Sequence, residues 1–314
     1  MGKLIVSIDF ELRWGILDIL GQDVEKYREN LLSVHENIPW ILKVFEERDI
    51  AATWATVGAV GCEDWNEFDR VKPLLKPSYQ NQQMVYDNDY NRMIDPKGKL
   101  YFAPELIKKI LKTKKQELGT HTFGHIYGTE PNVTYEELKY DLLSCKKFFS
   151  DKFSFSPESL VFPRNQVIYA DKLMKEGIIT TYRGNEPVEY LSADKQRTQK
   201  VVNRVKIFLD AVNPFVSHAY QMREVLYGNV RSSAMFRIYL PNILRKTHLN
   251  KLKKNIINLK EDEIYHIWFH PHNIGICQKK KDDFIYFFDF IAEQMNNKKL
   301  ESENMKTIFL KAQS

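Results

Sequence analysis

The sequence predicts an α/β fold in which parallel strands alternate with helices. Short apolar runs rich in β-branched and aromatic residues recur along the chain, and longer segments with a helical hydrophobic period separate them. Strands joined by crossover helices form a mostly parallel sheet or barrel. The chain has 314 residues, of which 43% are hydrophobic, so it can bury one large core. We therefore predict a single domain over residues 1–314.

The N-terminal part has the pattern of one strand–helix–strand unit. Residues 4–10 form an apolar run typical of a buried strand. Residues 27–48 place their apolar side chains at helical spacing, which predicts a long amphipathic helix. Residues 51–60 are again β-prone and predict the second strand.

The next elements carry clear boundary signals. Pro104 opens a predicted helix over 104–115, and a strand follows over 116–121. Thr134 with Glu137 three residues later forms a capping box for a helix over 135–150. The remaining predictions are an aromatic-rich helix over 283–295 and strands over 160–163, 178–182, 264–269 and 306–310.

Two stretches interrupt this alternation and are predicted to be insertions. Residues 62–98 are polar and lack a clear period, which is typical of an excursion over the surface. Residues 194–260 mix basic and aromatic side chains and are predicted to form an insertion or a subdomain.

Charge and cysteine content narrow the classes of function. The net charge of +5 is a small excess of 46 basic over 41 acidic residues, and no nucleic-acid-binding motif is present, so we expect no nucleic-acid partner. Cys62, Cys145 and Cys277 lie far apart, as expected for reduced thiols. The N-terminal apolar run is too short for a signal peptide, and no stretch reaches the roughly 20 apolar residues that span a bilayer. We expect a cytoplasmic protein.

Two motifs at predicted strand ends have the chemistry of a metal site. His121 and His125 are four residues apart, a spacing that can direct two imidazoles at one ion. Asp9 and Glu11 end the first strand and point to the same side of it, because side chains alternate along a strand. Since active sites of α/β proteins gather at the carboxyl ends of strands, we expect these four side chains to meet.

Two further strand ends carry candidates for acid–base chemistry. Arg164 follows an apolar strand and is expected to orient a carboxylate and keep it ionised. His270 and His272 follow the strand over 264–269, and a histidine side chain suits the general acid that protonates a leaving amine.

Together these motifs resemble the NodB-type polysaccharide deacetylases, carbohydrate esterase family 4. The family's first motif resembles the segment from Ser7 to Glu11, here in a D-x-E variant, and its H-[ST]-x-x-H motif matches His121 to His125 in full. The third motif is present as a variant, F-P-R-N, around Arg164. The resemblance runs in the family's order from Leu4 to about Leu310 and implies a distorted (β/α) barrel.

The resemblance also implies roles for these residues. Glu11, His121 and His125 would hold one divalent metal ion, expected to be zinc. The catalytic set would comprise Asp9 as general base, Arg164 as the residue that orients Asp9, and His270 as general acid, with Asp210 as a candidate partner of this histidine and His272 as a competing acid.

The implied activity is metal-dependent N-deacylation, in the first place deacetylation, of an amino sugar. A cytoplasmic protein points to biosynthesis of lipopolysaccharide or another surface polysaccharide, with a lipid-linked, nucleotide-linked or oligosaccharide substrate. Removal of a formyl or other acyl group by the same residues is an alternative, and a non-catalytic carbohydrate-binding domain is an alternative of another class.

Peripheral contact with the inner face of the membrane is a further hypothesis for residues 194–260. Basic side chains alternate there with apolar ones, and they could lie on an anionic bilayer, grip a phosphate, or form a solvated helix face that caps the barrel. The candidate residues are Arg237, Arg245, Lys246, Lys251, Lys253, Lys254, Phe236, Tyr239, Leu240 and Leu244.

Overall fold

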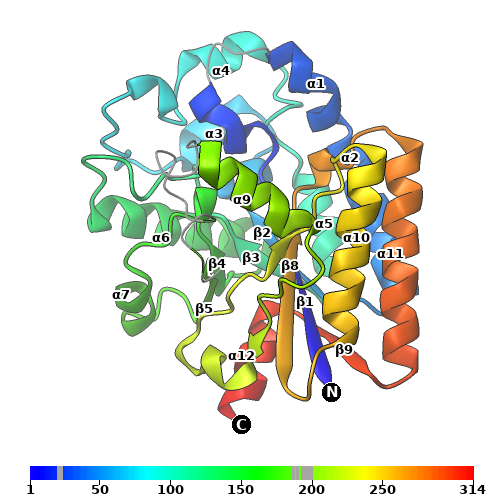
Figure 1. Ribbon diagram of the computed structural model, residues 1–314. Coiled ribbons are helices and arrows are strands. Elements are labelled where there is room, and N and C mark those ends of the chain that lie inside the picture. The colour runs from blue at the N-terminus through cyan, green and yellow to red at the C-terminus, as the bar shows by residue number, and fades with distance from the viewer. Residues whose placement is uncertain (20–23, 186–187, 189–190, 192–200) are drawn as a thin grey trace.

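The protein is built around one curled, mainly parallel sheet, seen in a computed structural model that describes residues 1–19, 24–185, 188, 191 and 201–314 (Figure 1). Among these residues the strand order is β5-β4-β3-β2-β1-β8-β6, with β7 also paired to β8 and β9 to β1. The strands are β1 (Gly2–Phe10), β2 (Ala52–Thr56), β3 (Gln116–Thr120), β4 (Ser159–Val161), β5 (Thr181–Arg183), β6 (Tyr220–Gln221), β7 (Ala234–Met235), β8 (Glu263–Phe269) and β9 (Leu300–Glu303).

Strand β1 is the centre of the sheet and is buried along its whole length. It pairs in parallel with β2, β8 and β9, which leaves the strand no exposed edge over its middle residues. The register aligns Phe10 with Thr56, Thr56 with Thr120, and Ile8 with Phe269. The residues that follow β1, β2, β3 and β8 are therefore brought to one edge of the sheet.

Helices cover the outer side of the sheet (Figure 1). Helices α2 and α11 pack on each other through aromatic side chains, with the ring centroid of Phe45 4.8 Å from that of Phe288 and 6.0 Å from that of Phe284. The helices are α1 (Val24–Leu32), α2 (Val34–Glu47), α3 (Trp65–Val71), α4 (Asp89–Ile94), α5 (Pro104–Lys112), α6 (Tyr135–Phe153), α7 (Ala170–Lys175), α9 (Val201–Val212), α10 (Asn242–Ile257), α11 (Gln278–Asn296) and α12 (Met305–Gln313). No helix in the described part of the chain is long and apolar enough to cross a membrane.

Most of the elements predicted from sequence are present, with shifted ends. The capping box of Thr134 and Glu137 at the start of α6 is confirmed, with both reciprocal hydrogen bonds formed. The predicted helix over 27–48 is divided into α1 and α2 at Ser33. The predicted strand over 51–60 ends at Thr56, because the chain then turns into a short 3₁₀ helix.

The predicted strand over 306–310 is wrong, since these residues belong to α12. The side chain of Asn304 caps this helix by accepting a hydrogen bond from the backbone N–H of Thr307. The buried residues Met305, Ile308 and Phe309 share one face only at helical spacing. A short apolar run fits both periods, and the strand of this region is the adjacent β9.

The two predicted insertions have regular structure of their own. Residues 62–98 include α3 and α4. Residues 194–260 lie partly outside the described residues; the described part supplies β6 and β7 to the sheet and adds α9 and α10.

Two buried histidines link the stability of this fold to pH. Burial lowers the pKa of His248 to about 4 and the pKa of His266 to about 3. In the unfolded chain both titrate near 6.5, so the unfolded state binds more protons below that pH and stability falls as the pH drops. Each histidine should make the free energy of unfolding about 2 kcal/mol lower at pH 5 than at pH 7.

We predict that His248→Gln reduces the loss of stability between pH 7 and pH 5 by about 2 kcal/mol, as measured by chemical denaturation at both pH values. Glutamine can keep both hydrogen bonds of His248, one accepted from the N–H of Arg237 and one donated to the carbonyl of Ala211. An unchanged pH dependence in this variant would contradict the argument.

Candidate active site

The predicted site residues converge at the carboxyl edge of the sheet. Asp9 lies near the end of β1 and Glu11 just after it, and both residues are buried. His121 and His125 follow β3, and His270 follows β8. The parallel register brings these strand ends together, as expected.

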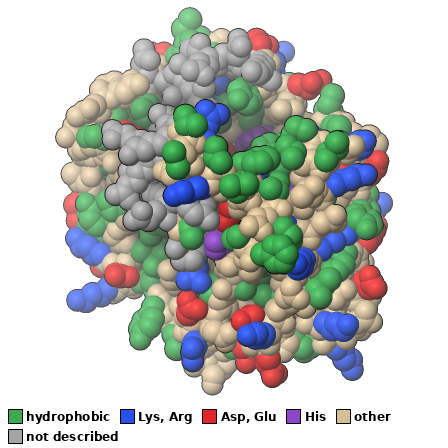
Figure 2. Space-filling model, in the orientation of Figure 1, with side chains coloured by type: hydrophobic (Ala, Val, Ile, Leu, Met, Phe, Trp, Pro, Cys, Tyr) green, Lys and Arg blue, Asp and Glu red, His purple; other side chains and the backbone are tan. Residues whose placement is uncertain are grey.

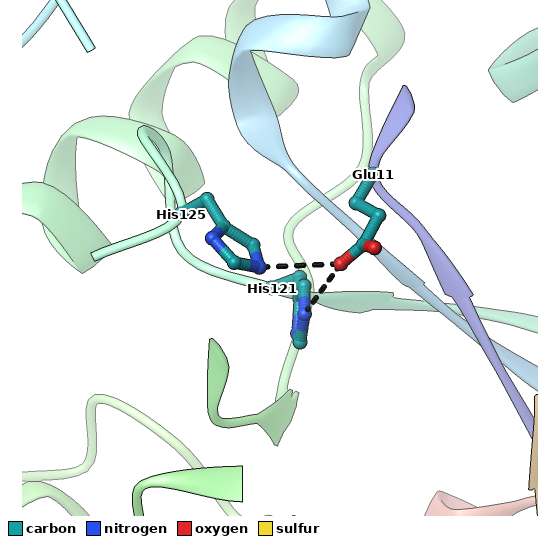
Figure 3. Close-up of side chains that lie close together, drawn as sticks. All are labelled: Glu11, His121 and His125. Atoms are coloured by element: carbon teal, nitrogen blue, oxygen red, sulfur yellow. Dashed lines mark ion pairs between the residues drawn. The ribbon is translucent and has the colours of Figure 1, made fainter. Parts of the chain in front are cut away.

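Glu11, His121 and His125 form a compact group of potential metal ligands (Figure 3). Oε2 of Glu11 lies 3.2 Å from Nε2 of His125 and 3.5 Å from Nε2 of His121. The three candidate ligand atoms all lie within 4.8 Å of one another, and all three residues are buried. Figure 3 shows the two imidazoles and the carboxylate pointing at one another from separate segments.

The hydrogen bonds around these imidazoles suit metal coordination. Nδ1 of His121 lies 2.7 Å from the carbonyl oxygen of Val161, so it donates to that carbonyl and leaves Nε2 with a free lone pair. Both ring nitrogens of His125 are buried without a hydrogen-bond partner in the described part of the protein. A carboxylate with two imidazoles is a usual ligand set for zinc in hydrolases. The residues present therefore fit a divalent metal ion.

The loop that carries the two histidines is held by a buried carboxylate. Asp141 on α6 accepts hydrogen bonds from the backbone N–H groups of Phe123 and Gly124, at 2.5 and 3.2 Å. The backbone is left-handed at Thr122 and His125, with φ of 65° and 57°, a conformation that is uncommon for non-glycine residues. Burial raises the pKa of Asp141 to about 7, although its hydrogen bonds with Phe123, Gly124 and Thr122 oppose the shift.

Gly15 makes room for the carboxylate of Glu11. A Cβ atom at this position would lie 2.0 Å from Cδ of Glu11 and 2.1 Å from its Oε1. The Glu11 side chain thus folds back over the backbone of Gly15, and a larger residue there would push the carboxylate away from the histidines.

The charge state of Glu11 is set by its surroundings. Burial alone would raise its pKa, but His270, His121 and His125 outweigh burial and hold the pKa well below its usual range. Glu11 is therefore anionic at neutral pH.

Asp9 is bound by an arginine from β5, the strand at one end of the sheet order. The guanidinium of Arg183, on β5, donates to both carboxylate oxygens of Asp9, at 2.7 and 2.9 Å. Burial would raise the pKa of Asp9, but the charges of Arg183, His121 and His270 lower it below its usual value. Asp9 is therefore ionised and held in one orientation.

Sequence reasoning gave the orienting role to Arg164, whereas the structure places Arg183 on Asp9. Among the described residues, the ion pairs of Asp9 are with Arg183 and His270. Arg164 lies in a 3₁₀ turn after β4 with φ of 55°. Its charge adds to burial in lowering the pKa values of His125 and His272, so it is close to the site without bonding to Asp9. Arg183 ends β5, next to the predicted strand over 178–182, and that position was the signal for it.

Sequence reasoning also missed the residues that hold Arg183. Its guanidinium donates to Oγ of Ser7 at 2.9 Å and to Oδ1 of Asn165 at 2.8 Å, and it lies over the ring of Trp268, 4.6 Å from the ring centroid. Oγ of Ser7 lies 2.8 Å from Nε2 of His266, whose low pKa keeps it neutral and able to accept this hydrogen bond. A buried chain of hydrogen bonds thus leads from β8 through Ser7 to Arg183 and Asp9.

His270 faces both carboxylates of the site. Its Nε2 lies 3.3 Å from Oε1 of Glu11 and 3.7 Å from Oδ2 of Asp9. The ring of His272 is 4.9 Å from that of His270, centroid to centroid. Burial, together with the charge of His270, lowers the pKa of His272 to about 4, so His272 is neutral near pH 7 and a poor proton donor.

Asp210, the candidate partner of the catalytic histidine, is bonded elsewhere. It lies on α9, where Oδ2 is 2.7 Å from Nε2 of His218 and Oδ1 is 3.0 Å from Nζ of Lys251. In the described part of the chain, the ion pairs of His270 are with Asp9 and Glu11.

Comparison with known proteins places the fold. No protein-family model and no curated protein sequence matches the chain. Among solved structures, a protein of Mycobacterium smegmatis assigned as a polysaccharide deacetylase aligns with a TM-score of 0.53 and 11% identity, over 99% of this chain and 90% of that one. The sheet is the distorted barrel of the polysaccharide deacetylases. The structure of Puue allantoinase aligns with a TM-score of 0.56 and 10% identity, over 98% of this chain and 89% of that one. At such low identity these likenesses establish the fold alone, and they confirm the predicted α/β class and barrel.

We predict that His125→Ala abolishes binding of Zn²⁺ and that Gly15→Ala weakens it by about 10- to 100-fold, because loss of a residue that positions a metal ligand costs affinity of this order. Metal content by mass spectrometry and titration with Zn²⁺ would measure both. Gly177→Ala is the control, since a Cβ there meets no atom within 4 Å although the backbone has φ of +69°. Binding by Gly15→Ala equal to that of Gly177→Ala would contradict the assignment of Glu11 as a ligand.

Proposed function

We propose that the protein is a metal-dependent hydrolase that removes an N-acyl group, in the first place acetyl, from an amino sugar. The observation that carries this proposal is the buried group of Glu11, His121 and His125 directly beside Asp9 and His270. A binding module would have no need for a metal-ligand set, an ionised carboxylate and a histidine in one place.

The proposed metal site would supply Lewis-acid catalysis. A divalent ion, here proposed to be zinc, lowers the pKa of water and polarises a carbonyl oxygen when it is bound. Glu11, His121 and His125 would hold the ion and leave at least one coordination position for the reactants.

Asp9 is proposed as the general base. Its carboxylate lies near Glu11 on the same strand end, as shown by the distances of both residues from His270. Arg183 keeps Asp9 ionised and fixes its orientation through two hydrogen bonds. Asp9 would accept the proton of the water that attacks the amide carbonyl.

His270 is proposed as the general acid. It stands on the opposite side of Asp9 and Glu11 from the two histidine ligands along the sheet, because β8 and β3 flank the β1–β2 pair. From there it would deliver a proton to the nitrogen that leaves when the amide C–N bond breaks. The products would be a free carboxylic acid and a sugar with an amino group.

The proposed substrate is an amino sugar of lipopolysaccharide or another surface polysaccharide, carried on a lipid or a nucleotide. The support is the run of motifs that resemble those of polysaccharide deacetylases. The same residues would serve for a formyl or other acyl group, because the attack on the carbonyl is unchanged and only the acyl pocket differs.

The direct test is incubation of zinc-loaded protein with a panel of N-acetyl and N-formyl amino sugars, free, nucleotide-linked and lipid-linked, followed by mass spectrometry for loss of the acyl group. Allantoin belongs in the panel because one structural neighbour is an allantoinase. Binding of the sugars without turnover of any compound would favour the non-catalytic alternative.

We predict that His270→Gln slows turnover by about 10²- to 10⁴-fold and leaves Zn²⁺ bound, because a general acid contributes this much to the rate. Steady-state kinetics with metal analysis of the same sample would separate the two effects. Loss of the metal in this variant would instead make His270 a ligand. His272→Gln is the matched control and should retain most activity.

We predict that Arg183→Lys slows turnover by about 10- to 100-fold, because lysine cannot replace the paired hydrogen bonds and each charged hydrogen bond is worth about 1.5–3 kcal/mol. Arg164→Lys should have the smaller effect, since Arg164 is not bonded to Asp9. The reverse order of the two variants would restore the orienting role to Arg164.

A further inference from the structure

Helix α9 turns most of its apolar residues toward solvent. Its exposed apolar side chains form the α9 face, defined here as Val201, Val202, Val205, Phe208 and Leu209, with exposed fractions of 74, 65, 51, 43 and 53%. These positions repeat at helical spacing and share one side of the helix. The buried residues of α9 are Asp210 and Ala211, at its end.

The C-terminal end of this helix is firmly attached to the protein. Asp210 pairs with Lys251 and His218, and the carbonyl of Ala211 accepts a hydrogen bond from His248. Lys251 and His248 both lie on α10, so α9 is anchored to that helix. Its apolar face is thus presented by a fixed element.

Other hydrophobic side chains lie on the same side of the molecule. Figure 2 shows them gathered over α9 and its surroundings, beside a depression in which a histidine side chain is visible. Helix α9 crosses the front of the molecule in the same orientation (Figure 1). An apolar surface next to a hollow is typical of a contact site for a partner.

Positive charge is concentrated in this part of the sequence. Residues 201–260 contain eleven Lys and Arg but two acidic residues, whereas the whole chain carries only +5. The remainder of the chain is therefore net negative. Arg204 and Lys206 lie on α9 itself and are exposed.

Some of the residues that the sequence analysis proposed for contact with a membrane are buried in the structure. Lys251 is buried against Asp210, and Arg245 is buried against Asp283. Phe236 is buried as well. Lys251 and Arg245 therefore attach α10 to its neighbours, and these buried residues are not available to a surface, so the candidate surface moves to α9.

We propose that the α9 face inserts into the surface of an anionic lipid bilayer, with Arg204 and Lys206 at the level of the lipid phosphates. An exposed apolar helix face flanked by basic residues matches the chemistry of interfacial helices. A second copy of the chain would bring two strongly basic surfaces together, which is unfavourable. Nucleic acid is a poor fit, because aliphatic Val and Leu side chains do not stack on bases.

One consequence concerns the substrate and rests on the proposed function. A protein bound to a bilayer through α9 would meet amino sugars carried on lipids at the membrane surface. The binding surface itself does not depend on the catalytic assignment, so the two can fail separately.

The test is sedimentation of the full chain with phosphatidylcholine vesicles that contain either no phosphatidylglycerol or 30% of it by composition, about the range used to mimic anionic membranes. We expect binding to the anionic vesicles only, weakened by high salt. The double variant Val205→Ser/Phe208→Ser should lower the partition coefficient about tenfold or more, and Arg204→Gln/Lys206→Gln should lower it by a similar factor.

Matched controls are Leu74→Ser, which alters a side chain that is 85% exposed outside this region, and Lys112→Gln/Lys114→Gln, which removes two exposed charges elsewhere. Both controls should bind as the parent does. Three results would overturn the proposal: no binding to anionic vesicles, equal loss in the controls, or a dimer in solution that Val205→Ser/Phe208→Ser dissociates. Circular dichroism checks that each variant is folded, and deacylation of a soluble sugar should be unchanged in all of them.

Discussion

The ion pair of Asp9 and Arg183 depends on the curl of the sheet, and the site depends on that pair. Strands β1 and β5 are separated by three others, so in a flat sheet they would be about 19 Å apart at the usual spacing of strands. The 2.7 Å bond between their side chains is possible because the sheet bends round until its interior faces meet. Backbone hydrogen bonds close the remaining gap, from Tyr182 to Gly228 and from Ser232 to Gly184.

Burial of so much charge also makes the site suited to a cation. Asp9 and Glu11 bring two negative charges into a buried region, and Arg183 neutralises one of them. An unpaired buried carboxylate is expensive, because its lost hydration must be replaced by opposite charge or hydrogen bonds. A divalent ion at Glu11, His121 and His125 would supply that charge where the described hydrogen bonds leave His125 without a partner.

The sequence allowed prediction of residues whose position follows from strand ends. Asp9, Glu11, His121, His125 and His270 each end or follow a strand, and parallel pairing alone brings them together. Arg183 also ends a strand, but its contact with Asp9 crosses the barrel interior. The spacing of residues in the sequence does not predict how strongly a sheet curls, so this contact could not be predicted. The prediction of secondary structure was wrong at residues 306–310, because a short apolar run there fits a strand and a helix equally well. Asn304 caps the helix that the structure contains.

The central place of β1 has a consequence for how the chain folds during synthesis. Ser7 on β1 bonds to His266 on β8, 259 residues further along. One edge of this buried strand therefore has no native neighbour until the ribosome has made nearly all the domain. Contacts between residues so distant in sequence form slowly. Before they form, the unpaired edge of a strand rich in apolar residues can associate with other chains. We therefore expect chaperones to bind the nascent chain of this protein until β8 and β9 have been synthesised.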